Sequence, residues 1–107
     1  MSIEKMVSFE NNEKREIDFL KLSLKSMKKR FLVQKNFKRN STLLFKELYK
    51  VLQYEDEYLI QTAFATYEAV RNIVKNQTFA DNSGEIFLFT LDGFMQKFLK
   101  ETSKLFD

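Results

Sequence analysis

Residues 17–31, with the sequence IDFLKLSLKSMKKRF, decide the fold of this chain of 107 residues. Apolar residues recur there at steps of three and four, which places them along one side of an α-helix. This apolar seam consists of Ile17, Leu20, Leu24, Met27 and Phe31, and Leu22, Leu32 and Val33 widen it at its edges. Asn11 or Asn12 is a suitable N-cap ahead of the acidic Glu13. The sequence therefore predicts a long first helix over residues 12–38.

The same spacing predicts two further helices in the middle of the chain. A second helix begins at a cap formed by Asn40 and Ser41 and ends near Tyr54. The acidic residues 55–57 open a third helix, because negative charge stabilises a helix N-terminus, and this helix runs to about Asn76. The apolar stripes of the two helices are Phe45, Leu48 and Leu52, with Leu44 and Val51 beside them, and Ile60, Ala63, Tyr67, Val70 and Val74.

Residues 77–90 leave two interpretations open, a short β-hairpin or the beginning of the last helix. Residues 81–84, DNSG, are typical of a turn, since Asp and Asn bond back to the backbone and Gly adopts positive φ freely. The apolar segments on either side could pair as strands near residues 77–89, but an isolated hairpin is only marginally stable in water. We therefore favour a packed loop or a helix here, with Thr90 as the N-cap of the last helix. The stripe of that helix is Leu91, Phe94, Phe98, Thr102 and Leu105.

The chain has the size of a single domain, and it contains no proline and only two glycines. Each predicted helix has one apolar side and cannot bury that side alone. Four such helices joined by short loops favour an all-α fold, a single small antiparallel bundle that takes in residues 1–107. Residues 1–10 precede the first predicted helix, and we expect them to be flexible.

The chain lacks the side chains that most catalytic and metal sites use. It contains no cysteine and no histidine, which excludes disulfides and thiolate zinc sites and removes the usual general base and nucleophile. The acidic residues 55–57 are consecutive, so their side chains fan around a helix and do not converge. Gly84 could align with the glycine of a calcium-binding EF-hand loop, but Phe79 and Thr90 then occupy two principal ligand positions. We therefore expect no enzyme, no metal and no cofactor.

No segment of the chain has the features of a targeting sequence or a membrane anchor. Residues 1–8 lack the apolar centre of a signal peptide, and no stretch approaches the roughly 20 apolar residues of a membrane span. We expect a cytoplasmic protein. The abundance of Lys, Phe, Asn and Ile, with few Gly and Ala, is typical of an AT-rich coding sequence, which fits a phage, a plasmid or another mobile element.

Charge is distributed unevenly along the chain. Residues 1–54 carry 13 basic and 6 acidic residues, whereas residues 55–107 carry 5 and 9. No acidic residue lies between Phe19 and Lys46. The candidate binding residues in this interval are Lys21, Lys25, Lys28, Lys29, Arg30, Lys35, Lys38 and Arg39. Three interpretations are open for them: a solvated helix face neutralised by the acidic second half, contacts to nucleic-acid phosphates, or contacts to an acidic protein or an anionic membrane.

A second candidate surface is the apolar run near the C-terminus. One side of a helix cannot bury every residue from 86 to 89, so part of the run is either covered by the end of the bundle or exposed as a partner or dimer surface. The candidate residues are Ile86, Phe87, Phe89, Phe94 and Phe98. The same question arises for Phe9 and Phe37, which flank the first predicted helix.

Two functional hypotheses follow from these two surfaces. The first is a non-enzymatic accessory or regulatory protein that binds nucleic acid, or a nucleoprotein assembly, through the basic first helix. The alternative is a protein-binding inhibitor or immunity factor of a phage, plasmid or other mobile element, which occludes a partner protein. A homodimer that forms through the bundle itself is a third prediction.

Overall fold

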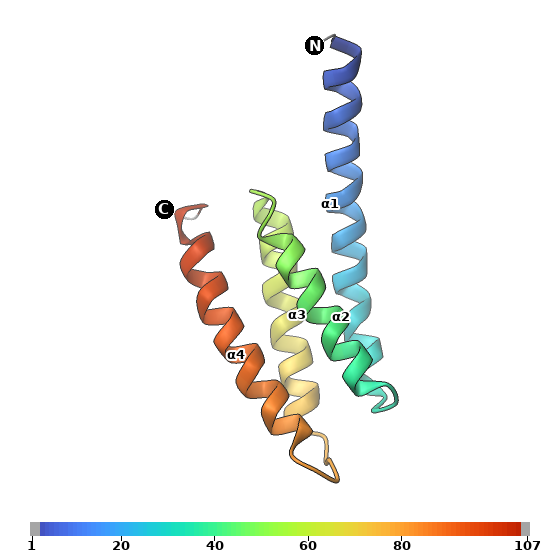
Figure 1. The fold of residues 1–107 in the computed structure, drawn as a ribbon, viewed down its shortest axis with the longest axis vertical. Coiled ribbons are helices and arrows are strands. Elements are labelled where there is room, and N and C mark those ends of the chain that lie inside the picture. Colours follow the sequence, from blue (N-terminus) through green and yellow to red (C-terminus); the bar gives the residue numbers. More distant parts are fainter. Residues whose placement is uncertain (1–2, 106–107) are drawn as a thin grey trace.

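The computed structural model describes the backbone of residues 3–105 and the side chains of residues 12–104. Its four α-helices are α1 (Ile3–Leu32), α2 (Phe37–Val51), α3 (Glu57–Lys75) and α4 (Ser83–Thr102), followed by one short 3-10 turn, η1 (Ser103–Leu105) (Figure 1). No strand occurs between residues 3 and 105, and residues 77–82 form a loop. The predicted all-α bundle of four helices is confirmed, and the alternative of a hairpin near residues 77–89 is absent from these residues.

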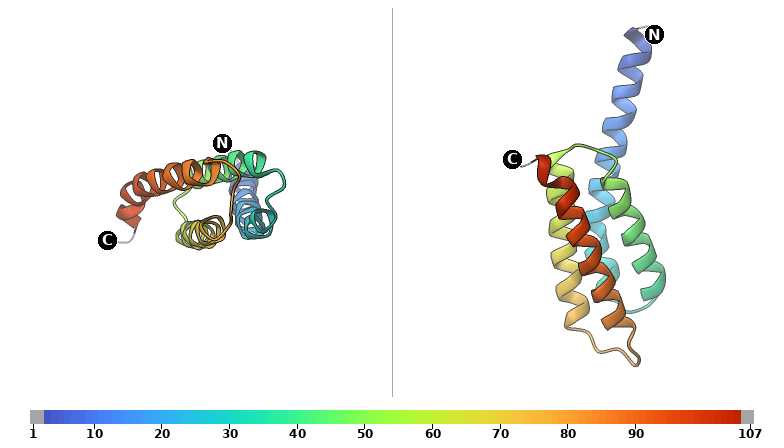
Figure 2. Two further views of the ribbon diagram at one scale, coloured as in Figure 1. Left: turned by 90° about the horizontal axis from the view of Figure 1, so that it is seen from below. Right: turned by 60° about the vertical axis from the view of Figure 1, so that its left-hand side comes forward.

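The helices form two layers, with α1 and α3 in one layer and α2 and α4 in the other (Figure 2). The chain reverses direction at each loop, so that α1 and α3 run the same way (Figure 1). Two hydrogen bonds agree with this direction, because a residue later in α1 bonds to a residue later in the chain. The Thr66 hydroxyl of α3 donates to the Leu24 carbonyl, and the side-chain amide of Gln77, just beyond the end of α3, donates to the Phe31 carbonyl. Helix α1 packs most closely on α3 and next most closely on α2.

The core lies between the two layers and takes residues from all four helices. The seam predicted for α1 is confirmed: Leu20, Leu24, Met27 and Phe31 are buried. The buried apolar residues of the other helices are Leu44, Leu48, Val51, Leu59, Ile60, Ala63, Val70, Val74, Phe87, Leu91, Met95 and Phe98. Leu22, Leu32 and Val33 do not widen the seam, because each is more than half exposed.

Helix α1 begins earlier and ends earlier than the sequence suggested. It begins at Ile3 and passes through Asn11 and Asn12, which therefore do not cap it. Neither proline nor glycine occurs before these asparagines, so nothing in the chain stops the helix there. The helix ends at Leu32, and Asn36 then adopts a left-handed conformation with φ of 63°. Asparagine tolerates this region better than most residues, which permits a tight turn without glycine.

Helix α2 begins at Phe37, ahead of the predicted cap. Asn40 is buried one turn inside the helix, where its side-chain amide donates to the Arg30 carbonyl at 3.3 Å. At the other end of the same helix pair, the Tyr54 hydroxyl donates to a Glu16 carboxylate oxygen. These two hydrogen bonds fasten α1 to the segment 37–54 near both ends of that segment.

Helix α3 has the predicted beginning. The Asp56 carboxylate accepts a hydrogen bond of 2.8 Å from the Leu59 backbone amide, and Glu57 occupies the first turn. An aspartate at the N-cap satisfies an amide that has no partner inside the helix, and it also suits the helix dipole. The acidic residues therefore act as helix initiators, as the sequence indicated.

Helix α4 begins at Ser83, inside the DNSG segment and seven residues before Thr90. Of this segment only Asp81 and Asn82 bend the chain ahead of the helix, and the Asp81 carboxylate accepts a hydrogen bond of 2.9 Å from the Ser83 amide. Hydrogen bonds from Ser83 hold the pKa of Asp81 below its usual range. Thr90 lies inside the helix, where its hydroxyl donates to the Ile86 carbonyl. Gly84 has no positive φ and is instead buried beneath Phe79.

The molecule is long and thin, with extents of 57 × 30 × 17 Å along its three axes. The N-terminal part of α1 projects beyond the ends of the other helices (Figure 1). In the part of the chain that the structure describes, none of the helices combines the length and the apolar character needed to cross a membrane.

Candidate functional site

A basic groove runs between α1 and α3 on one face of the molecule. Its volume is about 630 Å³. The α1 wall contributes Lys21, Leu24, Lys25 and Lys28, and the α3 wall contributes Tyr58, Gln61, Thr62, Ala65, Thr66 and Ala69. The α1 wall is cationic, whereas the α3 wall carries no charge and combines Tyr58 and Gln61 with small alanine and threonine side chains. The structure thereby brings three of the eight predicted basic residues to one site.

The two ends of this groove differ in charge. At one end Lys21 Nζ lies 3.8 Å from an Asp56 carboxylate oxygen and 5.7 Å from the centre of the Tyr58 ring. At the other end Lys25 and Lys28 are exposed and make no ion pair with any residue between 12 and 104. The acidic N-terminus of α3 thus neutralises only the first of the three lysines. A cationic stretch of groove remains available to an anion.

The other five predicted basic residues lie around the turn that joins α1 to α2. These are Lys29, Arg30, Lys35, Lys38 and Arg39, and all five are exposed. The Asn40 side chain ties this turn together through the Arg30 and Lys35 carbonyls. Lys38 and Arg39 occupy the first turn of α2, where no acidic residue is present and positive charge opposes the helix dipole. The described residues offer none of these five an ion pair within 4.0 Å.

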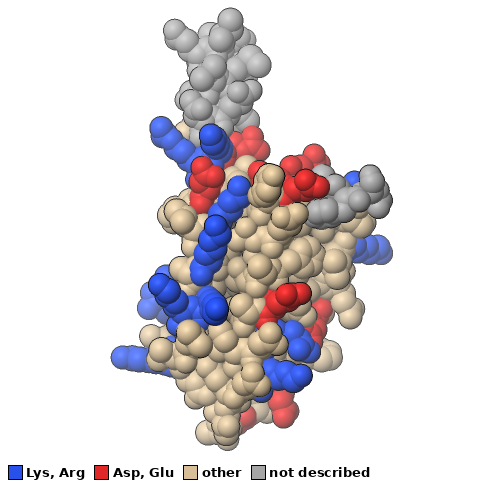
Figure 3. Space-filling view, turned by 180° about the vertical axis from the view of Figure 1, so that it is seen from behind, with Lys and Arg blue, Asp and Glu red and all other residues tan. Residues whose placement is uncertain are grey.

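Among the described residues, the acidic half of the chain forms an ion pair with little of the predicted basic surface. Of the eight basic residues, only Lys21 forms an ion pair with a described residue, at Asp56. Figure 3 shows basic side chains in a column along the side that α1 forms, with acidic side chains gathered toward the top and the opposite side. Repulsion between neighbouring lysines disfavours such a column unless an anion binds there.

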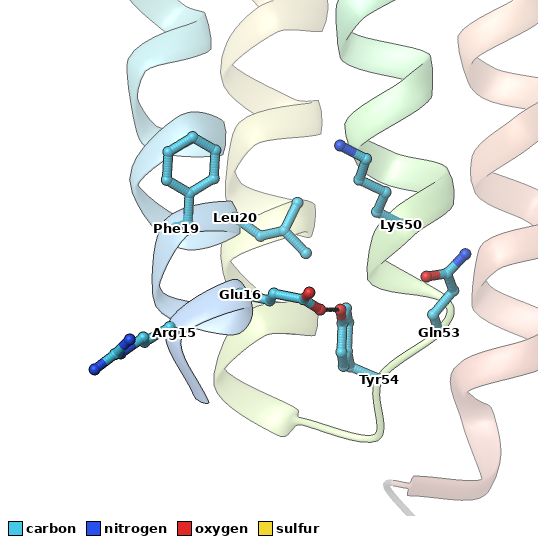
Figure 4. Close-up of a pocket in the computed structure, with 7 residues that line it drawn as sticks. All are labelled: Arg15, Glu16, Phe19, Leu20, Lys50, Gln53 and Tyr54. Carbon is cyan, nitrogen blue, oxygen red and sulfur yellow. Dashed lines mark hydrogen bonds between the residues drawn. The ribbon is translucent and has the colours of Figure 1, made fainter. Parts of the chain in front are cut away.

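A second depression of about 530 Å³ lies where α1 leaves the bundle (Figure 4). Its lining residues are Arg15, Glu16, Phe19, Leu20, Lys50, Gln53 and Tyr54. Glu16 is engaged by the Tyr54 hydroxyl, and Arg15 points away from the other labelled residues. The hydrogen bond to Glu16 raises the pKa of Tyr54 to about 12. The one acidic group of this depression therefore already has a hydrogen-bond partner.

One polar cluster that the sequence did not reveal connects α3 to α4. Asp92 accepts hydrogen bonds from Arg71 Nε at 3.0 Å, from Arg71 Nη2 at 3.2 Å and from the Tyr67 hydroxyl at 2.6 Å. The Arg71 guanidinium, followed by the Tyr67 hydroxyl, holds the pKa of Asp92 below its usual range. Burial and the hydrogen bond to Asp92 raise the pKa of Tyr67. All three groups are satisfied by one another, so the cluster fastens two helices.

The predicted apolar surface is divided by the structure. Phe87 and Phe98 belong to the core, being 4% and 0% exposed, so for these two residues the structure agrees with the interpretation that the bundle covers them. Phe94 is half-buried, and so is Phe37. Ile86 and Phe89 face outward on α4. The side chains of four consecutive residues project to all sides of a helix. In this run Phe87 is therefore buried, whereas Ile86 and Phe89 are exposed. The Phe9 side chain lies outside the described residues.

Between residues 12 and 104, no three carboxylates converge on a point where a metal ion could bind. Comparisons with protein-family models, with curated proteins and with solved structures find no match to this chain. The possible function of the basic groove therefore has to be inferred from the residues that line it. Sequence reasoning identified its α1 wall from lysines at helical spacing but missed the α3 wall, because Tyr58, Ala65 and Ala69 carry no signal until α3 is placed beside α1.

Proposed function

We propose that this protein is a non-enzymatic accessory or regulatory protein that binds the phosphate backbone of a nucleic acid, alone or within a nucleoprotein assembly. The proposed binding site is the α1–α3 groove. The observation that supports it is that Lys25 and Lys28 line the groove and are exposed, without an ion pair to any residue between 12 and 104. Clustered cations of this kind attract phosphates by displacing their counterions.

The spacing of the groove lysines suits a phosphate backbone. Lys21 and Lys28 are seven residues apart on one helix, a rise of about 10.5 Å, which matches the rise of about three base pairs along the axis of a duplex. All three groove cations are lysines, which provide point charges and not the bidentate geometry that arginine offers to guanine. Binding should therefore depend strongly on salt and weakly on sequence.

The test is a fluorescence-anisotropy titration of labelled DNA and RNA oligonucleotides, single-stranded and duplex, at several salt concentrations. We expect the variant Lys25→Gln with Lys28→Gln to bind more weakly, and the slope of log K against log salt to fall by about two, because each phosphate contact contributes about 0.9. Both lysines are exposed, so the thermal midpoint should remain that of the unmodified protein.

The matched control removes the same charge from the opposite layer. Lys97 and Lys100 are exposed on α4, and replacing both with glutamine should leave the salt slope nearly unchanged. Equal losses in the two double variants would mean that net charge, and not the groove, drives binding. The absence of any binding at low salt would disprove the proposal.

A further inference from the structure

Four large apolar side chains are exposed on the layer formed by α2 and α4. The exposed fraction is 65% for Tyr49, 56% for Ile86, 84% for Phe89 and 53% for Leu99. Phe89 lies one helical turn after Ile86, so the two side chains are neighbours on the outer side of α4. This layer faces away from the α1–α3 groove (Figure 2). The exposed apolar area is therefore separate from the proposed nucleic-acid site.

A shallow groove of about 310 Å³ lies between α2 and α4 next to these residues. Its lining residues are Phe37, Lys38, Ser41, Thr42, Phe45, Ser83, Ile86, Phe87 and Thr90. Aromatic rings join the two helices beneath it, with centroid distances of 5.9 Å from Phe45 to Phe87 and 6.0 Å from Phe45 to Phe94. Beyond them Tyr49 packs on Phe94 at 5.7 Å. Helices α2 and α4 run in the same direction and are connected by these aromatic contacts. The apolar surface between them, lined by the residues above, is called the α2–α4 trough.

The margins of this trough are positive. Lys38 lines it, and two exposed lysines continue its walls at helical spacing, since Lys46 comes four residues after Thr42 on α2 and Lys97 comes seven residues after Thr90 on α4. Helix α2 presents no exposed acidic residue, since its single acidic residue, Glu47, is buried. Between residues 86 and 100 of α4 the single acidic residue is Asp92, which Arg71 and Tyr67 hold on the side of α3.

We infer that the α2–α4 trough docks an amphipathic helix of a partner protein whose apolar stripe is flanked by Asp and Glu. An apolar trough between two helices accepts a third helix through residues at three- and four-residue spacing. The lysine margins select acidic flanks by charge complementarity. They also disfavour a second copy of this chain on the same face, because a symmetric pairing would bring like charges together.

The test uses two synthetic amphipathic helices of about 15 residues with the same leucine stripe, one flanked by glutamate and one by lysine. Fluorescence anisotropy should show the acidic peptide binding at least about tenfold more tightly than the basic one. Replacing both Ile86 and Phe89 with serine should weaken the acidic peptide by at least about tenfold. Replacing both Lys46 and Lys97 with glutamate should reverse the preference toward the basic peptide.

Exposed apolar residues on the other layer provide the control. Leu22 and Val33 on the α1 side are 67% and 61% exposed, and replacing both with serine should leave peptide binding unchanged. Circular dichroism establishes that each variant is folded. The inference is overturned if neither peptide binds, if the basic peptide binds as well as the acidic one, or if the serine pair on α4 has no effect. A dimer that the serine pair on α4 dissociates would also overturn it, in favour of a second copy on this face.

Discussion

The ring of Phe79 lies so close against the backbone of Gly84 that a methyl group on this glycine would sit 2.5 Å from the Phe79 Cδ2 atom. This contact fixes the loop before α4 on the first turn of the helix. The same ring packs on Phe37 with a centroid distance of 4.8 Å, so it connects the loop to the beginning of α2 as well. Gly84 is thus required for its small size.

Replacing Gly84 with alanine should lower the free energy of unfolding by about 1–3 kcal/mol, because the Phe79 ring must move out of a packed position. The other glycine gives an internal control. A Cβ on Gly93 meets nothing within 4 Å, so Gly93→Ala should raise stability by about 0.5–1 kcal/mol through helix propensity. Denaturant titrations of both variants measure the difference, and equal effects would contradict the packing role of Gly84.

The Asp92 cluster predicts a pH-dependent part of the stability. The pKa of Asp92 is lower in the folded protein than its ordinary value of 3.8. Its contribution is therefore complete above that ordinary value and is lost as the pH falls through the lower folded value. Asp92→Asn should reduce the thermal midpoint at pH 7, and the gap to the unmodified protein should close below pH 3.8. In contrast, Glu68→Gln, at an exposed site on α3, should follow the unmodified protein at every pH.

A buried carboxylate on α2 lowers the stability of the bundle. Glu47 is 5% exposed, its Oε2 atom has no hydrogen-bond partner, and Oε1 lies 3.6 Å from Lys50 Nζ. Replacing Glu47 with methionine, which is similar in size and apolar, should raise the free energy of unfolding by about 1–3 kcal/mol. Lys50→Met should lower it, because that change removes the partner and leaves the charge. A loss of stability in Glu47→Met would show that Glu47 has a further partner.

Tyr54 should ionise at unusually high pH. The hydrogen bond to Glu16 stabilises the neutral phenol and raises its pKa from 10.0 to about 12. A folded pKa above the unfolded one means that this contact contributes its full stability below pH 10 and loses it as the pH passes about 12. Ultraviolet difference spectra of the unmodified protein and Tyr54→Phe isolate this one phenol among the four tyrosines. Replacing Glu16 with glutamine should lower the pKa, and an unchanged value would contradict the assigned hydrogen bond.

The sequence predicts the helices of this protein better than their ends. The apolar seam of α1 and the Asp56 cap of α3 rest on spacing and on local capping chemistry, which a sequence contains. The end of α1 at Leu32 depends on Asn36 adopting a left-handed conformation, and no proline or glycine marks it. The sequence suggested Asn40 as an N-cap, but Asn40 is buried inside α2 and its side-chain amide donates to the Arg30 carbonyl of α1. This hydrogen bond depends on how the two helices pack, which local sequence does not show.

The sequence predicts only part of the residues that form the candidate surfaces. Lysines at helical spacing identified one wall of the α1–α3 groove. Its other wall and the α2–α4 trough depend on which helices become neighbours, and four amphipathic helices can be arranged in more than one way. The sequence left open which residues of the run 86–89 are covered, because that depends on which helices pack against α4; the structure buries Phe87 and exposes Ile86 and Phe89.

The arrangement in two layers gives the molecule a shortest dimension of 17 Å. If each layer holds a partner of its own, this protein acts as a thin spacer, with a nucleic acid on one broad side and a protein on the other. The two bound molecules would then be separated by little more than two helix diameters. That separation exceeds the Debye length of about 8 Å at physiological ionic strength, so salt would weaken the binding of the nucleic acid without the charges of one bound molecule acting strongly on the other.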